Sequence, residues 1–220
     1  EEKKKKKKGA FYPECAWKRV VSIATGAISG MLVLSMITGK LASYFMDMQM
    51  KKEKGLMPLK NLKGHFLLCG WRSGFEKILD NIINTNPEIT PDLIVLINDA
   101  PSEKIENLLD LERFKEIHYV SGDFADENVL KRANIQTAER ALIISDHSKE
   151  YSDLEIDSRT VLAVISMSNI NPGMYIAAEL IDSKFEKHLR MAHCDEIILT
   201  TDYEHNLLAS ASGGMGYSNV

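Results

Sequence analysis

A long apolar segment, Thr25 to Phe45, precedes a chain that is otherwise ordinary in polarity. From Val20 to Thr38 there is no charged residue, and about 20 apolar residues at about 1.5 Å each cross a hydrocarbon core of about 30 Å. A secretory signal would be shorter and end in a small-residue cleavage site, whereas here the helical pattern continues through "LASYFMDMQ". We predict one transmembrane helix over residues 16–48. A buried core helix is the alternative, and it would normally carry a polar stripe.

Lysines are concentrated on the C-terminal side of this helix, and cytoplasmic flanks of membrane helices collect lysine. We therefore expect the following residues to be cytoplasmic and the protein to lie in the cell (inner) membrane. Lys18, Arg19 and the N-terminal "KKKKKK" favour the opposite orientation. The lysines that support the first orientation are Lys40, Lys51, Lys52, Lys54, Lys60 and Lys63.

Composition excludes other classes of protein. A net charge of −4 without a basic face argues against nucleic-acid binding. The three cysteines, Cys15, Cys69 and Cys194, are far apart and form no CxxC pair, so neither a disulfide framework nor a zinc site is indicated.

Residues 64–202 alternate between strand-like and helix-like runs, which predicts a mainly parallel sheet with helices on both faces. We therefore expect an α/β fold, a Rossmann-like doubly wound domain, joined to the membrane helix by a lysine-rich linker over residues 49–63 that contains Gly55 and Pro58. The expected strands are 65–71, 92–99, 116–123, 140–146, 173–180 and 195–201. The expected helices are 72–85, 102–114 with Ser102 as its cap, 126–135, 158–170 and 183–193.

Such a sheet binds ligands at the carboxyl ends of its strands, where the strand order reverses. The first turn, "CGWRSG", lacks the full GxGxxG fingerprint because Arg72 and Phe75 replace the second and third glycines, although Arg72 could pair with phosphate. A plain tight turn is the alternative there. Asn98 and Asp99 stand where dinucleotide binders place an acid for the ribose hydroxyls. The candidate nucleotide-binding residues are Gly70, Trp71, Arg72, Ser73, Asn98, Asp99, Asp123, Phe124, Asp146 and His147.

Four segments together resemble the N-lobe of the domain that regulates potassium conductance, the RCK domain, also found in bacterial potassium-uptake regulators. They are "HFLLCGW", "YVSGDFADENVLKRANI", "RALIISD" and "YIAAELIDSKFEKHLRMAHCDEII". The resemblance implies a gating ring that responds to nucleotides in the Rossmann cleft or to calcium held by carboxylates. Asp157 and Glu179 fall on two of the family's calcium positions, but Ile181 falls on the third. NAD or another adenine nucleotide is therefore preferred, with calcium second.

Residues 9–45 read "GAFYPECAWKRVV", then a glycine-bearing apolar helix, then "TGKLASYF". This order is similar to the piece of a tetrameric potassium channel that runs from the end of the selectivity filter into the pore-lining inner helix. In that comparison Gly9 ends the filter, and Gly30 or Gly26 lies near the gating hinge. However, "EEKKKKKK" stands where the filter's TVGY should be. We therefore expect residues 1–15 to be a truncated remnant of the filter and outer mouth, and residues 203–220 to begin a truncated crossover segment.

These resemblances together imply a potassium channel gated by a cytoplasmic RCK ring: a homotetramer in a lipid bilayer, multi-pass in its full-length form, with potassium as the transported ion. A nucleotide-sensing regulatory subunit of a potassium transporter is the alternative. We do not expect an enzyme, because no tyrosine has a lysine four residues further on and no HExxH motif is present.

Overall fold

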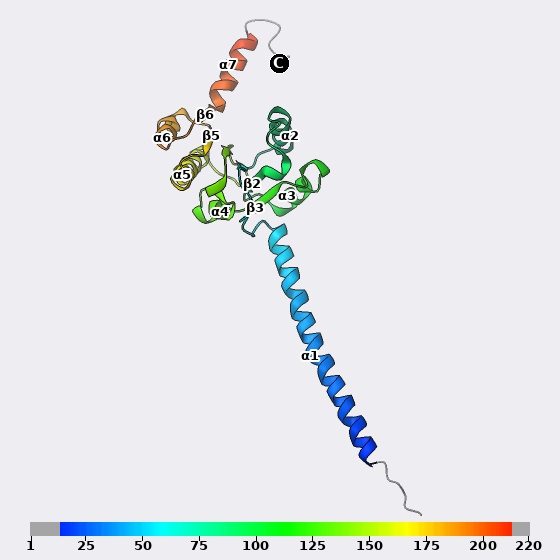
Figure 1. The fold of residues 1–220 in the computed structure, drawn as a ribbon. Coiled ribbons are helices and arrows are strands. Elements are labelled where there is room, and N and C mark those ends of the chain that lie inside the picture. Colours follow the sequence, from blue (N-terminus) through cyan, green and yellow to red (C-terminus); the bar gives the residue numbers. More distant parts are fainter. Residues whose placement is uncertain (1–13, 213–220) are drawn as a thin grey trace, which may run out of the picture. The chain divides into compact units, whose positions relative to one another are not determined.

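The computed structural model describes residues 14–212 and divides into two units, Glu1–Met50 and Lys51–Val220. The first unit consists of helix α1 (Glu14–Glu53), which extends into the second unit by its last residues. The second unit holds a parallel sheet and its covering helices (Figure 1).

Helix α1 has exposed apolar side chains and internally hydrogen-bonded hydroxyl groups. Within it, Val20–Lys52 is long and apolar enough to cross a membrane, and the side chains in this stretch are exposed. Its hydroxyl groups bond back to carbonyls of the preceding turn: Thr25 Oγ1 donates to Val21 O over 2.9 Å, and Thr38 Oγ1 donates to Leu34 O over 2.8 Å. Such bonds satisfy polar groups inside the helix, as a lipid-facing helix requires.

Helix α1 continues to Glu53, several residues beyond the predicted end at residue 48, and stops in a Schellman motif. Leu56 N donates to Lys51 O over 2.8 Å, and Gly55 N donates to Lys52 O over 3.0 Å. Gly55 has a φ of +64°, the left-handed conformation that this motif needs and that glycine adopts without strain.

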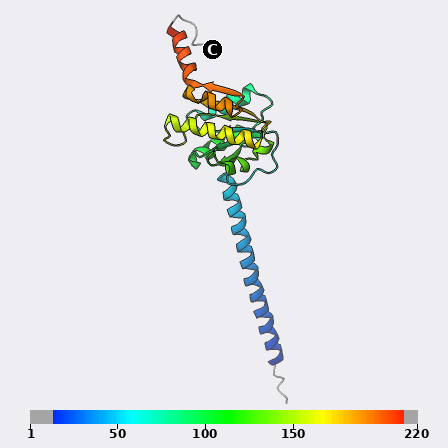
Figure 2. The same ribbon diagram turned by 90° about the vertical axis from the view of Figure 1, so that its left-hand side faces the viewer.

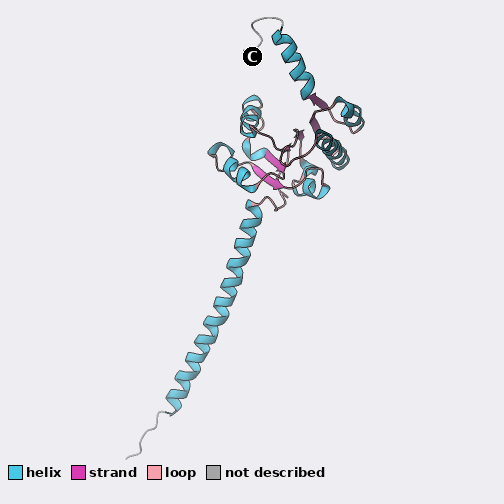
Figure 3. Cartoon of the chain, turned by 180° about the vertical axis from the view of Figure 1, so that it is seen from behind, coloured by secondary structure: helices cyan, strands magenta, loops and turns pink. Residues whose placement is uncertain are grey.

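The six strands are all parallel and follow the order β3-β2-β1-β4-β5-β6. Figure 3 shows the strands in magenta among the cyan helices. The strands are β1 (Phe66–Cys69), β2 (Ile94–Asn98), β3 (His118–Ser121), β4 (Arg140–Ile143), β5 (Tyr175–Leu180) and β6 (Glu196–Leu199). The helices of this unit are α2 (Phe75–Thr85), α3 (Ser102–Leu109), α4 (Glu127–Arg132), α5 (Asp153–Ile170), α6 (Glu186–Met191) and α7 (Thr200–Ser212). The short 3₁₀ turns are η1 (Pro91–Leu93), η2 (Glu112–Phe114), η3 (Ile135–Thr137) and η4 (Ser183–Phe185).

Helices cover both faces of the sheet. Successive side chains of a strand point to opposite faces, so Leu68 of β1 packs with Leu79 of α2, whereas Leu67 packs on the other face with Val164 of α5. Figure 2 shows α5 lying across the sheet. All four side chains of β1 are buried, which is typical of a parallel sheet. The predicted doubly wound Rossmann-like fold is confirmed.

Helices α2 and α6 begin three residues after their predicted starts at 72 and 183, and the start of α5 and the cap of α3 also differ from the prediction. Helix α5 begins at Asp153, five residues before the predicted start, because Ser152 and Glu155 form a capping box in which each side chain bonds to the other residue's backbone N–H. The prediction that Ser102 caps α3 is wrong: Pro101 is the N-cap residue and Ser102 is the first helical residue. Helix α3 also ends at Leu109, and η2 follows as a separate turn.

The segment between α1 and β1 is bound to the domain. Ser121 N at the end of β3 donates to Gly55 O over 3.0 Å, and Leu59 N donates to Arg132 O at the end of α4 over 2.8 Å. Asn134 Nδ2 donates to Leu62 O over 2.7 Å, and the side chain of Leu62 packs against the core. The end of α1 is thereby connected to the strand end that carries Gly122 and Asp123.

Candidate functional site

The strand order reverses between β1 and β4, and Gly70 forms the turn at this point. Gly70 N donates to Ile97 O over 2.9 Å, and its φ is +99°. A Cβ atom at Gly70 would lie 2.5 Å from Ile144 O. Only glycine fits here, so the chain leaves β1 in close contact with the residue that follows β4.

The turns that follow β1 and β4 are hydrogen-bonded to each other. Trp71 N donates to Asp146 Oδ1 over 3.1 Å, and His147 N donates to Trp71 O over 2.6 Å. Asp146 is buried and also accepts from Ser148 N over 3.1 Å. The turns after β1 and β4 therefore lie side by side, and together with the turns after β2 and β3 they form the region called the crevice below.

Arg72 is bound to Glu179 of β5. Arg72 Nη1 lies 2.9 Å from Glu179 Oε1, which also accepts from Thr200 Oγ1, while Glu179 Oε2 accepts from Ser145 N over 2.8 Å. Burial alone raises the pKa of Glu179, but the hydrogen bonds from Thr200 and Ser145 N and the charge of Arg72 outweigh it and lower that pKa overall. The sequence suggested Arg72 for phosphate and Glu179 for calcium, whereas the structure pairs the two with each other.

The other predicted metal residue, Asp157, supports the backbone. Its Oδ1 accepts from Ile181 N over 3.0 Å and its Oδ2 accepts from Asp182 N over 2.8 Å. Burial raises the pKa of Asp157, and these two bonds oppose the rise. Among the side chains that the structure describes, no cluster of three or more His, Cys, Asp or Glu is arranged to hold a metal ion. The calcium assignment of Asp157 and Glu179 stays a prediction.

The end of β2 contributes Asn98 and Asp99. Asn98 is buried, and its Oδ1 accepts from Ala100 N over 3.2 Å, so this oxygen shapes the turn. Asp99 is partly exposed and forms an ion pair with Lys149 from the loop between β4 and α5. Of the two residues, Asp99 is the one whose carboxylate forms a partly exposed ion pair, and a ligand could replace Lys149 in that pair.

Asp123 and Asp146 share a cation that the sequence interpretation missed. Arg159 Nη2 lies 3.0 Å from Asp123 Oδ1 and 3.3 Å from Asp146 Oδ2, and the guanidinium lies 5.2 Å from the centroid of the Phe124 ring. Arg159 is the single basic residue of α5, and the other residues of this helix are acidic, neutral polar or apolar. That isolated charge was the available signal.

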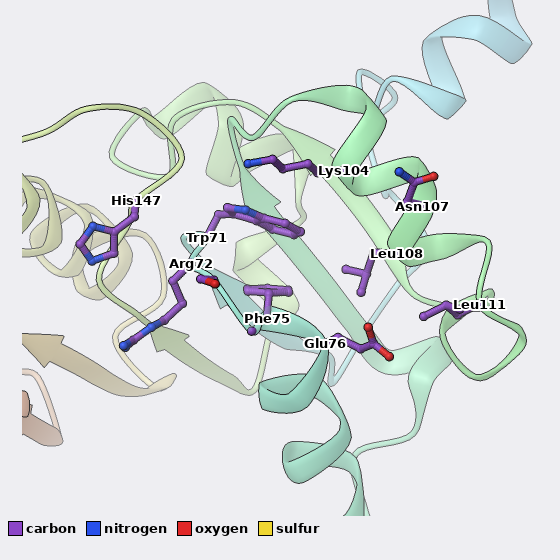
Figure 4. A pocket seen from close by; sticks show the side chains of 11 residues that line it. Trp71, Arg72, Phe75, Glu76, Lys104, Asn107, Leu108, Leu111 and His147 are labelled. Carbon is purple, nitrogen blue, oxygen red and sulfur yellow. The ribbon is translucent and has the colours of Figure 1, made fainter.

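A cavity of about 580 Å³ lies beside the crevice, between α2 and α3 (Figure 4). The rings of Trp71 and Phe75 are stacked in it, with centroids 4.7 Å apart and planes 24° apart. Figure 4 shows Lys104 running along the side of the Trp71 ring that faces away from Phe75. The lining residues are Trp71, Arg72, Ser73, Gly74, Phe75, Glu76, Lys104, Asn107, Leu108, Leu111 and His147. Four predicted binding residues, Trp71, Arg72, Ser73 and His147, therefore border one cavity.

The predicted gating residues lie in the first unit or outside the described residues. Gly26 and Gly30 are exposed positions in the unbroken helix α1, and a Cβ atom added at either would meet nothing within 4 Å. Their role as a hinge stays a prediction. Gly9 lies outside the described residues.

The strand order and the turns describe a Rossmann-type domain with a cluster of polar side chains at its switch point, preceded by a candidate membrane helix. Residues 61–178 match the family model described as the calcium-activated potassium channel slowpoke-like RCK domain. The chain belongs to this family, and the predicted resemblance to RCK domains is confirmed.

Relatives and solved structures agree with this assignment. The chain is 26% identical over 193 residues to the calcium-gated potassium channel TvoK of Thermoplasma volcanium, covering 87% of this chain and 52% of the relative. It is 26% identical over 211 residues to the putative potassium channel protein YugO of Bacillus subtilis, covering 86% and 60%. The chain thus spans between half and two thirds of the length of these relatives. The GsuK channel structure has a TM-score of 0.59 at 15% identity, covering 95% of this chain and 54% of that one.

Proposed function

We propose that this chain is the inner pore helix and the ligand-sensing domain of a potassium channel gated by an adenine nucleotide. The observation that carries the proposal is a backbone hydrogen bond that links the crevice to the end of the helix. Gly55, two residues after α1, accepts this bond from Ser121, two residues before Asp123. A ligand that moves the turn after β3 would therefore act on the end of α1 through one backbone contact.

The crevice favours a nucleotide over calcium. Lys149 and Arg159 can neutralise phosphate charge, Asp99 stands at the ribose position, and the Trp71 ring offers a flat face beside the crevice. GsuK structures that share the fold at 17% and 16% identity are bound to ADP and to NAD, respectively. For calcium, which prefers six to eight oxygen ligands, the oxygens of Asp157 and Glu179 already accept protein hydrogen bonds.

The assembly follows from the same proposal. Channels of this architecture surround a central pore, so we propose a homotetramer in the cell membrane with α1 lining the pore, Gly30 or Gly26 as its hinge, and the RCK domain in the cytoplasm. Potassium would be the transported ion, and the domain would act as a regulatory module without catalysis. Covalent continuity between α1 and the domain favours the channel over a separate regulatory subunit.

The test is a calorimetric titration of the purified chain in detergent with NAD, NADH, ADP, ATP and calcium, each at the same ionic strength. We expect heat of binding from at least one of the four nucleotides, at a stoichiometry of one per chain. Binding of calcium with no response to any nucleotide would exchange the preferred ligand for the second one. No binding by any of the five would remove the sensor function.

A further inference from the structure

Arg159 is a cation enclosed in the crevice with part of its bonding capacity unused. Its side chain is 13% exposed, and only Nη2 takes part in the ion pairs with Asp123 and Asp146. Nε and Nη1 are buried and have no hydrogen-bond partner among the residues that the structure describes. A guanidinium has five N–H donors in a planar fork, so this one can donate further hydrogen bonds to anionic oxygens.

Two aromatic rings hold the plane of this guanidinium. Its carbon lies 4.2 Å from the centroid of the Tyr151 ring and 5.2 Å from that of Phe124. Arginine stacked on aromatic rings and presenting a planar fork is the arrangement that proteins use to recognise phosphate bidentately. Tyr151 is partly buried and belongs to the loop between β4 and α5, so a ligand reaches Nε and Nη1 by displacing the Tyr151 ring.

The two acidic partners of Arg159 differ in how easily they can be replaced. Asp146 is 2% exposed and is fixed by bonds from Trp71 N and Ser148 N. Asp123 is 48% exposed and, besides Arg159, accepts from the nearby Ala125 N. A solvent-exposed carboxylate gains little from an ion pair, so Asp123 is the partner that a more highly charged phosphate group can replace.

We propose that Arg159 is the residue that recognises the phosphate groups of the nucleotide, exchanging Asp123 for phosphate oxygens when the ligand binds. The proposal rests on the proposed function, because it concerns the same crevice. The loop that carries Tyr151 also carries Lys149, so its movement breaks the ion pair with Asp99. Asp99 and Asp123 are then free to accept hydrogen bonds from ribose hydroxyls. Because Arg159 binds phosphate oxygens, the ligand class is a nucleotide rather than a nucleoside.

The test compares adenosine, AMP and ADP by calorimetry on the whole chain in detergent. In the wild type, ADP should bind at least tenfold more tightly than adenosine. Arg159→Gln should remove most of this preference, because charge-assisted hydrogen bonds to phosphate account for about 10- to 100-fold in affinity. Adenosine should bind the variant within about twofold of its wild-type affinity. Arg190→Gln, on α6 in an exposed pair with Glu186, is the matched control and should leave the preference unchanged.

The ratio of adenosine to ADP affinity decides the result even if Arg159→Gln lowers stability. Arg159→Lys provides a second variant that keeps the charge but lacks the planar fork, and its preference for ADP should lie between those of wild type and Arg159→Gln. An unchanged ratio in both Arg159 variants would overturn the assignment while leaving the nucleotide sensor intact. Failure of all three ligands to bind the wild type would overturn the assignment, and failure of NAD, NADH and ATP as well would overturn the nucleotide function.

Discussion

Replacing Gly70 by alanine would push apart the two strands that form the crevice. The added Cβ would lie 2.5 Å from Ile144 O and 3.1 Å from Ile144 Cγ1. The carbonyl cannot rotate away on its own, because Ile144 N donates to Cys69 O over 3.0 Å and so holds this residue against β1. Relief of the overlap therefore requires β1 and β4 to separate at their carboxyl ends.

The magnitude follows from three contributions. A non-glycine residue at a φ of +99° is strained by about 1–3 kcal/mol, and loss of the Ile144 N to Cys69 O bond costs about 1 kcal/mol. The reduced freedom of the unfolded chain offsets about 0.4–1 kcal/mol. We expect Gly70→Ala to lower the free energy of unfolding by about 2 kcal/mol.

Gly74→Ala is the matched control. Gly74 also has a positive φ, +74°, but a Cβ there would meet nothing within 4 Å. Left-handed strain of about 1–2 kcal/mol, less the same unfolded-state offset, predicts a loss of about 1 kcal/mol. The two variants should differ by about 1 kcal/mol, or about 2–4 °C in melting temperature for a chain of this size.

The assay is thermal unfolding of both variants followed by circular dichroism in the same detergent, with ADP titrated into each. Gly70→Ala should melt at the lower temperature and bind ADP more weakly than Gly74→Ala. Equal melting temperatures would show that β1 and β4 do not meet at Gly70 as described, and the switch-point crevice would lose its structural basis.

Two further predictions concern the connection to α1 and the acid sensitivity of the domain. Gly55→Ala should lower the free energy of unfolding by about 2–3 kcal/mol, because its Cβ would lie 2.6 Å from Tyr119 Cδ1 and 2.7 Å from Ser121 N at a strained φ. The control is Gly64→Ala, at a φ of +63° with only Glu139 Oε2 within 4 Å, at 3.9 Å, which should cost about 1 kcal/mol. Equal effects of the two variants in chemical denaturation would refute the packing of Gly55 on β3. Since the pKa of Glu179 is lower in the folded chain than in the unfolded chain, its stabilisation should be fully present above pH of about 4.3 and disappear as the pH falls through the folded-state pKa. The stability advantage of the wild type over Glu179→Gln should therefore shrink on acidification, and an advantage that grows instead would contradict the hydrogen-bonded, ionised state of Glu179.

The fold was accessible from the sequence because its signals are local. Hydrophobic strands of the "LIVLIN" type alternate with amphipathic helices, and this alternation fixes a parallel sheet before any contact is known. The N-terminus of α5 was missed although "SDLE" is a capping box, because the apolar pattern begins further along the helix. Ser102 was taken as a cap, but the preceding proline occupies that position.

The side-chain partners in the site were not accessible, because they join residues far apart in the sequence. Arg72 and Glu179 are 107 residues apart, and Arg159 and Asp123 are 36 apart. A turn motif indicates that Arg72 could meet a phosphate, but not that Glu179 of β5 already occupies its guanidinium. The binding of the linker to β3 and α4 was hidden for the same reason, since backbone hydrogen bonds leave no side-chain pattern.

Potassium flux measured in liposomes that contain the full-length protein tests the central claim most directly. The flux is recorded at a fixed potassium gradient while ADP is added on the side that the RCK domain faces, beside a parallel measurement of ADP binding. The account predicts that flux changes over the same ADP concentrations at which the crevice fills, and that Arg159→Gln shifts both curves together to higher concentration. ADP binding to the crevice with a flux that stays constant across the whole titration would contradict it.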